Sequence, residues 1–257
     1  MMLKIYNKTK TILGLGLVLA GFNFKLKTEN SYLGTLWYLF DPLFTFLLLF
    51  LIFSNRLGNN IDSYPLYLFL GIIVFSFFSK TTTELIKLVV ENRWLIRSIK
   101  FPYESLVLAG IFKNLFSHFF EVVLLMALTL FFGQSIIGFI FYPIILFVFC
   151  FFIYGVCLLL SSLYVYFCDL ENVWDYFSRL LWFATPVFYS FGNQNELLFF
   201  NLFNPLYLFI EIFRESIIYL RSPKPVLILV AIFFSFLFFA SGTIVFNKLK
   251  HSFPEKI

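Results

Sequence analysis

The chain has 257 residues, of which 61% are hydrophobic and only 13% are charged, and its mean hydropathy is +0.90. A soluble domain of this size needs far more polar surface around its core, so this composition excludes an ordinary soluble protein. The formal net charge of +5 is modest, and in a membrane protein the placement of basic residues matters more than their sum. We therefore expect an all-α integral membrane protein.

The first 30 residues predict an amphipathic helix that lies at the membrane interface. Five lysines surround the largely apolar run 11–24. This run is short for a membrane span, and it lacks the A-x-A cleavage site of a signal peptide. An interfacial helix would place its lysines among lipid headgroups. We assign residues 1–30 to this segment and residues 31–257 to the membrane domain.

Six apolar segments follow, each long enough to cross a hydrocarbon core of about 30 Å. They are Leu36–Ser54, Tyr64–Ile86, Glu104–Phe132, Ile136–Phe167, Val173–Phe191 and Pro225–Asn247. The third and fourth are long enough to tilt or to extend beyond the bilayer. The fifth contains Pro186, which is expected to break or kink it. The pattern therefore predicts six transmembrane helices.

Residues 197–220 are apolar enough for a seventh span, but Asn204-Pro205 interrupts them and Glu211, Arg214 and Glu215 follow. With six spans and both termini inside, 14 of the 19 lysines and arginines lie at the inner side. A seventh span would place the basic C-terminal tail outside, against the positive-inside rule. We therefore predict two short re-entrant or interfacial helices on the outer side, where only protein or a water-filled cavity tolerates them.

One cytoplasmic loop, residues 91–102, combines basic side chains with an aromatic one. Two of its arginines lie one helical turn apart, and a proline is expected to end the helix. The loop is either a plain basic juxtamembrane loop anchored by its tryptophan, or a short helix in the membrane plane that inserts into a soluble partner. The residues in question are Arg93, Trp94, Leu95, Arg97, Lys100 and Pro102.

Three ionisable residues lie inside the predicted third span: Lys113, His118 and Glu121. Such groups within a bilayer are functional hypotheses by default. Lys113 and Glu121 are two helical turns apart and share a face. They either form a polar stripe along a pathway or a proton relay, or they pair with each other or with a neighbouring helix.

Aromatic residues make up 23% of the chain, and 41 of them are phenylalanines. These rings face lipid, or some of them line a path for a ligand with flat apolar faces, such as a sugar. Trp37, Tyr38 and Phe40, near the start of the first span, are candidates for such contacts. The alternative for these three is an interfacial aromatic belt.

Motifs for enzymatic chemistry are absent from the sequence. No G-x-x-x-x-G-K-[ST], H-E-x-x-H or G-x-S-x-G run occurs, so we expect neither an ATP-binding loop nor an enzyme. The three cysteines lack zinc-binding spacing, and no metal site is expected.

Several motifs, in this order and spacing, resemble a known family. They are Ser31-Tyr32-Leu33-Gly34-x-x-Trp37, Tyr64-Pro65-x-Tyr67-Leu68-x-x-Gly71, Asn92-x-x-Leu95-Ile96-Arg97-x-x-x-Phe101-Pro102, Pro186-Val187-x-Tyr189, and Asn204-Pro205 with Arg214. The chain resembles the membrane subunits of ABC-2 type polysaccharide exporters, the O-antigen and teichoic acid permeases. One departure is Cys168, where the family often has a basic residue.

The resemblance implies a half-transporter in the cytoplasmic (inner) membrane that forms a homodimer and binds two copies of a soluble ABC ATPase. ATP and Mg would bind that ATPase, and this chain would hold no cofactor. Residues 91–102 would be the coupling helix. The outer gate region would include Asn204, Pro205, Glu211 and Arg214. The substrate would be a lipid-linked polysaccharide, O-antigen-like, that crosses between the two protomers; no nucleic acid is expected.

Three other readings remain open at this point. The same architecture serves permeases for teichoic acid, a drug or a lipid. A proton-coupled carrier would work through Lys113, His118 and Glu121 without an ATPase. A membrane transferase is the weakest of the three, because clusters of acid–base residues are scarce.

Overall fold

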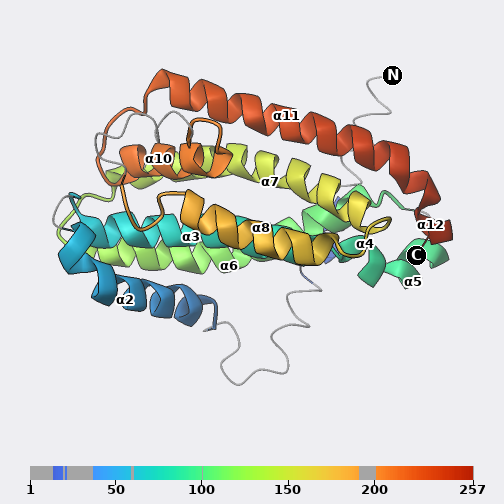
Figure 1. Cartoon of the computed structure of the whole chain (residues 1–257), viewed down its shortest axis with the longest axis horizontal. Helices are drawn as coiled ribbons and strands as arrows, with labels where there is room; N and C mark the ends of the chain where they lie inside the picture. The colour runs from blue at the N-terminus through green and yellow to red at the C-terminus, as the bar shows by residue number, and fades with distance from the viewer. Residues whose placement is uncertain are drawn as a thin grey trace.

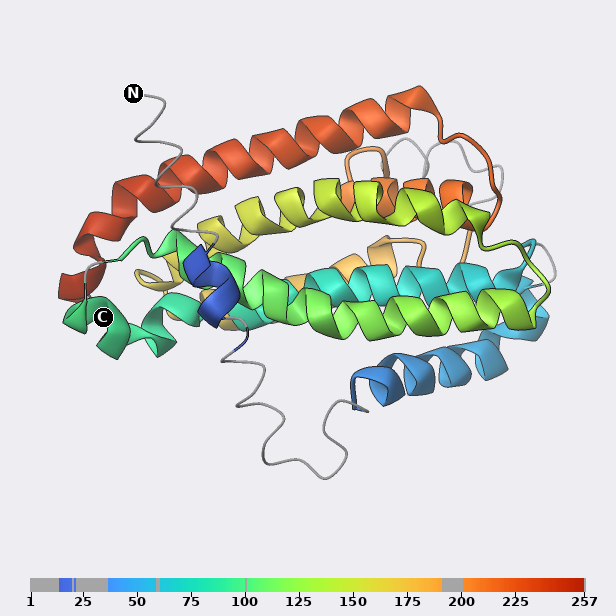
Figure 2. The same cartoon turned by 180° about the vertical axis from the view of Figure 1, so that it is seen from behind.

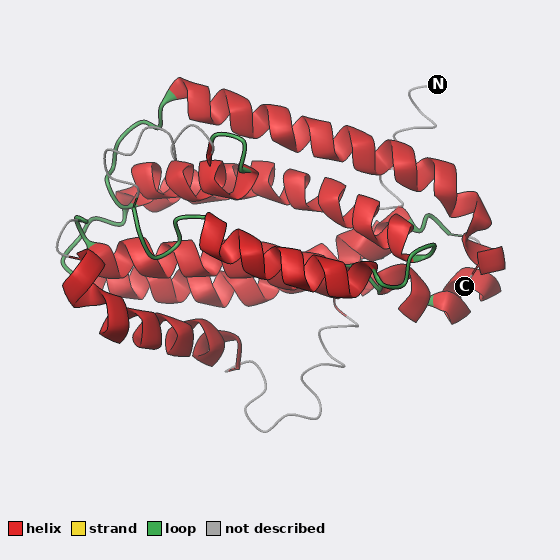
Figure 3. Ribbon diagram, in the orientation of Figure 1, coloured by secondary structure: helices red, strands yellow, loops and turns green. Residues whose placement is uncertain are grey.

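The computed structural model describes residues 14–19, 21, 37–58, 61–99, 101–190 and 201–256, and at positions 37–39 and 57 it describes only the backbone. All regular secondary structure in these ranges is helical (Figure 3). The prediction of an all-α protein is therefore confirmed for the described part of the chain.

Long helices run alongside one another in an elongated bundle, and three short ones gather at one end (Figure 1). We call this end, which is formed by α4, α5 and α12, the α5 end. The helices are α2 (Trp37–Leu57), α3 (Tyr64–Leu85), α4 (Leu88–Glu91), α5 (Arg93–Ser98), α6 (Glu104–Phe131), η3 (Ile137–Phe141), α7 (Tyr142–Tyr164), α8 (Leu170–Ala184), α10 (Pro205–Ile217), α11 (Pro225–Leu249), η4 (Lys250–Ser252) and α12 (Phe253–Lys256).

Among the described residues, four helices are long and apolar enough to cross a membrane. They are Tyr64–Leu85, Glu104–Phe131, Ile137–Tyr164 and Pro225–Lys256. These correspond to the predicted second, third, fourth and sixth spans. The chain is therefore a multi-pass membrane protein. The helices α2 and α8, which stand at the predicted first and fifth spans, are not among these four, so the number of six spans stays a prediction.

Helix α3 forms the centre of the bundle and contacts α2, α6, α7, α8 and α10. In its most apolar window 78% of residues are buried inside the protein, compared with 17% for the last span. Because α11 exposes apolar side chains along most of its length, lipid is its natural surrounding.

Helix α8 is shorter than the predicted fifth span. It has 15 residues and ends at Ala184, and Thr185 adopts an extended backbone conformation. The following residue is Pro186, whose ring disfavours helical geometry at the residue before it. Proline therefore ends this helix, and residues 185–190 continue as non-helical chain.

Two further segments bear on predictions made from the sequence. Residues 14–19 are helical and lie against the start of α6 (Figure 2), where an ideal Cβ on Gly16 would be 3.3 Å from Leu108 Cβ. In the predicted re-entrant region, α10 forms a single helix of 13 residues, whereas residues 191–200 lie outside the described ranges. The re-entrant arrangement stays a prediction.

Candidate functional site

Helix α5 is a short, exposed helix at one end of the bundle. Trp94 is 75% exposed, whereas Ile96, on the opposite face, is 3% exposed. A large aromatic side chain exposed to this extent at the end of a bundle is typical of a residue that a partner covers. The helix ends at Ser98 because Ile99 has an extended backbone.

The proline of this loop lies elsewhere than expected. Pro102 does not end α5; it stands at the entrance of α6, where its carbonyl accepts hydrogen bonds from the Ser105 amide at 3.0 Å and from Ser105 Oγ at 2.7 Å. Lys100 lies outside the described residues. Leu95 packs against the core, so α5 is fixed from its inner face.

Helix α12 packs against α5. Helix α12 contacts α5, and its Phe253 is fully buried with an edge-to-face contact to Phe246 of α11. An ion pair of 2.7 Å joins Lys250 to Glu104 at the start of α6. These contacts hold α5 at a fixed place relative to the long helices.

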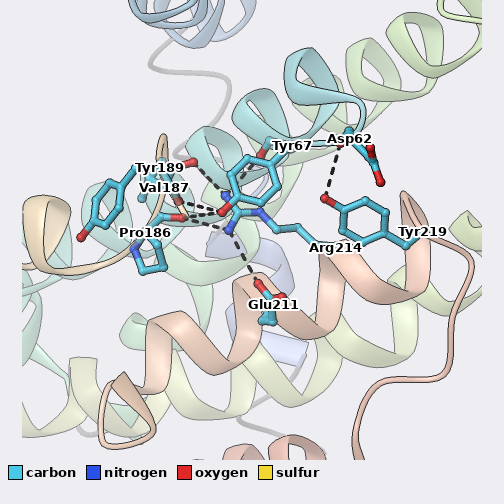
Figure 4. Close-up of polar contacts among 8 residues, drawn as sticks. All are labelled: Asp62, Tyr67, Pro186, Val187, Tyr189, Glu211, Arg214 and Tyr219. Carbon is cyan, nitrogen blue, oxygen red and sulfur yellow. Dashed lines mark hydrogen bonds and ion pairs between the residues drawn. The ribbon is translucent and has the colours of Figure 1, made fainter. Parts of the chain in front are cut away.

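At the opposite end of the bundle, the guanidinium of Arg214 is completely buried (Figure 4). It donates hydrogen bonds to the carbonyls of Pro186 at 2.9 Å, Val187 at 2.8 Å and Tyr67 at 3.3 Å. Its Nη1 lies 3.8 Å from a carboxylate oxygen of Glu211. A buried cation is tolerated when it is paired and hydrogen-bonded. Both Nη atoms meet this condition here, whereas Nε has no hydrogen-bond partner among the described residues.

Aromatic contacts complete the Arg214 centre. The guanidinium carbon lies 3.3 Å from the centroid of the Tyr67 ring, a cation–π arrangement. Tyr67 Oη in turn donates to the Tyr189 carbonyl at 2.8 Å. Glycine at position 71 leaves room for this cluster, because a Cβ there would lie 2.7 Å from Arg214 Nη2.

The Arg214 centre also binds the segment that follows α8. We call residues Thr185–Tyr189 the strap. Asn204 caps α10 by accepting a hydrogen bond from the Leu206 amide at 3.1 Å, and its Nδ2 donates to Thr185 Oγ1 at 2.9 Å. Pro205 occupies the first turn of α10, a favourable place for proline. Asn204 and Arg214 thus contact the strap directly and Glu211 pairs with Arg214, whereas Pro205 only begins α10.

The three ionisable residues of α6 do not form one stripe of mutual pairs. Lys113 pairs with Glu84 of α3. His118 Nδ1 lies 2.9 Å from a Glu121 oxygen, and His118 Nε2 shares a hydrogen bond of 2.7 Å with the Tyr142 hydroxyl. The structure contains both kinds of pairing that the sequence offered as one alternative, with each other (His118–Glu121) and with neighbouring helices (Lys113–Glu84 and His118–Tyr142).

A polar groove of about 780 Å³ lies between α2, α3 and α6. Lys80 of α3 crosses its mouth, with Nζ 2.7 Å from Asp41 of α2 and 3.7 Å from Glu121 of α6. The groove extends to Glu91, the last residue of α4. It therefore connects the middle of the bundle with the α5 end.

A second hollow, of about 420 Å³, lies between α3 and α8. Trp182 meets Phe75 edge-to-face there, with ring centroids 4.8 Å apart. Its polar lining comes from Ser79, Lys80, Thr83, Asp175, Ser178 and Arg179. Two of these, Lys80 and Thr83, also line the groove. Helix α3 therefore presents a polar stripe between α2 and α8.

The predicted aromatic contacts are only partly described. Trp37 and Tyr38 stand in the first turn of α2, and their side chains lie outside the described set. Phe40 stacks on Phe44 at a centroid distance of 6.0 Å, and Phe44 lines the groove.

Sequence reasoning missed the residues of α3 and α8 that face these hollows. Lys80 and Glu84, four residues apart near the end of an apolar helix, were a usable signal, because like the α6 residues they are ionisable groups at membrane depth. Lys87, just beyond α3, pairs with Glu171, and this hydrogen bond raises the pKa of Lys87. Within the described residues, no three His, Cys, Asp or Glu side chains gather to hold a metal ion.

Comparison with known proteins identifies the family of the chain. Residues 16–218 match the family model described as ABC-2 type transporter. A protein named O-antigen export system permease protein RfbA from Myxococcus xanthus is 23% identical over 262 residues, covering all of both chains. Two proteins of the same name from Klebsiella pneumoniae are 23% and 22% identical, covering 99% and 93% of both chains. The chain therefore belongs to the ABC-2 type transporter family.

Proposed function

We propose that this chain is the membrane subunit of an ATP-driven exporter that moves a lipid-linked polysaccharide, O-antigen-like, across the cytoplasmic membrane. Two copies would form the channel, two copies of a soluble ATPase would supply the energy, and both termini would lie in the cytoplasm. The family match carries the transporter part of this proposal, and the names of the full-length relatives favour O-antigen over teichoic acid, a drug or a lipid.

The docking part of the proposal rests on the exposed face of α5. The chain contains no phosphate-binding loop, so the energy of ATP must reach it through a contact. Trp94 offers a rigid aromatic anchor, and the contacts of α12 would transmit its movement to the long helices. This arrangement favours a coupling helix over a plain juxtamembrane loop.

The channel part rests on the polar stripe of α3. Ionisable side chains at membrane depth face protein or a water-filled path, because lipid does not solvate them. In a single chain Lys80 is about half exposed between α2 and α8. A second copy opposite this stripe would enclose it and leave a polar, aromatic-flanked route between the two protomers.

A proton-coupled carrier finds less support in this arrangement. Each of the three α6 residues that would relay protons has a hydrogen-bond or ion-pair partner, which explains its presence without transport of protons. We therefore retain this alternative only as an outcome of the experiment below.

Purification of the tagged protein from its native membrane in mild detergent tests the proposal. We expect a soluble protein with a Walker A motif to copurify in equal amount, as identified by mass spectrometry. A chain that purifies alone after gentle crosslinking, and that still transports in vesicles without ATP, would contradict the proposal and favour the proton-coupled carrier.

A further inference from the structure

The groove between α2, α3 and α6 shares Lys80 and Thr83 with the hollow between α3 and α8, and it reaches Glu91 of α4, next to α5. Its deeper wall is rigid, because His118 and Glu121 are buried and bonded to each other. Its mouth is formed by the exposed side chains of Asp41 and Lys80. A site with fixed polar groups inside and exposed charges at its rim is able to hold a ligand rather than only to stabilise the fold.

Four carboxylates, those of Asp41, Glu84, Glu91 and Glu121, line the groove together with the ammonium groups of Lys80 and Lys87. Lys80 lies between Asp41 and Glu121, and Glu84 pairs with Lys113 and accepts a hydrogen bond from Asn114 at 3.0 Å. An anionic headgroup would meet this excess of carboxylates, whereas a cation would find Asp41, Glu84 and Glu121 already paired with lysines. An uncharged polyol suits both the carboxylates and the ammonium groups, because each of its hydroxyls donates a hydrogen bond to a carboxylate and accepts one from an ammonium.

An aromatic surface borders these polar groups. Phe44 lines the groove and is 62% exposed, and Phe40 stacks behind it. The flat apolar face of a sugar ring packs well on such a phenyl ring while its hydroxyls point to polar partners. The volume of about 780 Å³ lies within the range of small-molecule sites and suits one or two sugar rings.

We propose that this groove is a carbohydrate site that binds a sugar unit of the glycan before it enters the channel. The inference rests on the proposed function. Since the groove reaches Glu91 beside α5, a sugar in it would lie near the element that docks the ATPase. The ligand class is an uncharged glycan segment, with Phe44 as the stacking surface and Asp41, Lys80 and Glu121 as hydrogen-bonding partners.

Photo-crosslinking in intact cells that make the glycan tests this site. The probe is p-benzoylphenylalanine, placed by the substitution Phe44→p-benzoylphenylalanine. Phe119 on α6 offers a matched control, because it is a phenylalanine of 61% exposure that does not line the groove. After irradiation, the glycan on the purified chain is detected by periodate oxidation and a biotin hydrazide.

We expect at least about tenfold more glycan adduct from position 44 than from position 119. Ser117, which lines the groove on α6, gives a second reporting position if the α2 variant is poorly produced. Equal adducts from groove and control positions, or adducts only to phospholipid or to a second copy of the chain, would overturn the carbohydrate site.

Surface glycan is measured in the same cells, so the two proposals fail separately. If the glycan still reaches the surface while neither groove position captures it, the groove inference is wrong and the exporter stands. If deletion of the chain leaves the surface glycan unchanged, the proposed function itself is wrong, and the groove inference falls with it.

Discussion

At the scale of single residues, the buried Arg214 determines where the strap lies. One guanidinium serves three carbonyls and one aromatic face, and these come from two separate parts of the chain. The planar fork of arginine suits this arrangement, whereas a lysine ammonium would reach fewer of the acceptors. The strap is therefore held by geometry as much as by charge.

Arg214→Lys is predicted to destabilise the protein by at least about 2 kcal/mol, because buried carbonyls of the strap lose their donors. The loss would lower the midpoint of thermal unfolding in detergent by about 5 °C or more. Arg221→Lys is the control, since Arg221 is an exposed arginine just beyond α10. An unchanged midpoint for Arg214→Lys would show that the strap does not depend on the guanidinium.

These contacts also mark a limit of sequence reasoning at this scale. The motif residues Tyr67, Gly71 and Arg214 are visible along the chain, but 147 positions separate Tyr67 from Arg214. Lys113 and Glu84 are likewise 29 positions apart. Hydropathy indicates which charges lie at membrane depth, yet it does not indicate which helix supplies the partner, because that depends on packing.

At the scale of elements, α7 and α11 form the closest helix pair of the bundle. Gly155 and Gly242 face each other, and a Cβ on either would collide with the backbone of the other helix. Small residues let membrane helices approach closely, and van der Waals packing then holds them together. The last span is fixed to the bundle chiefly through this contact.

Gly242→Ala is predicted to separate α7 from α11 and to lower the thermal midpoint in detergent by several degrees, because no flexible side chain is available to move aside. Gly14→Ala, where a Cβ meets nothing within 4 Å, should leave the midpoint unchanged. Equal behaviour of the two variants would mean that this helix contact contributes little.

Under the proposed function, α5 is the element through which energy coupling would pass. Trp94→Ala is predicted to reduce ATP-driven export about tenfold or more while the protein still folds, because the side chain is exposed and contributes little to the core. Phe147→Ala, at a similarly exposed ring on α7, serves as the control. Surface glycan and ATP hydrolysis are measured together; normal export in Trp94→Ala would remove the coupling role.

The elements themselves were largely predictable from the sequence. The boundaries of α3 and α6 agree with the predicted spans to within one residue. A continuous apolar run marks the length of helix that crosses the hydrocarbon core, so the ends of the run predict the ends of the helix. The predicted break at Pro186 is confirmed: α8 ends at Ala184, because Thr185, the residue before the proline, adopts an extended backbone.

At the scale of the whole molecule, a single chain leaves the polar stripe of α3 partly exposed. The stripe of α3 lies between α2 and α8, and α8 also carries exposed apolar residues along one face, among them Val173, Tyr176, Leu180 and Phe183. A polar face flanked by apolar side chains is what a second copy would cover. This arrangement leads us to expect a symmetric dimer.

Light scattering in detergent is predicted to give twice the protomer mass of 30.3 kDa, after subtraction of the micelle. Leu180→Gln on α8 should increase the fraction of monomer several-fold, because it places an amide in the dimer contact. Leu237→Gln on the exposed face of α11 should not. A monomer in the unmodified protein would contradict the dimeric channel.

The most direct test of the proposed ATP-driven export is transport in inside-out membrane vesicles that contain the chain and its ATPase. We expect that ATP, but not a non-hydrolysable analogue, moves the glycan into the vesicle lumen, where external periodate no longer reaches it. Trp94→Ala should abolish this protection while the lipid-linked glycan stays on the outer face of the vesicle. Protection of the glycan from periodate that develops without ATP, or that is unchanged in Trp94→Ala, would contradict ATP-driven export coupled through α5.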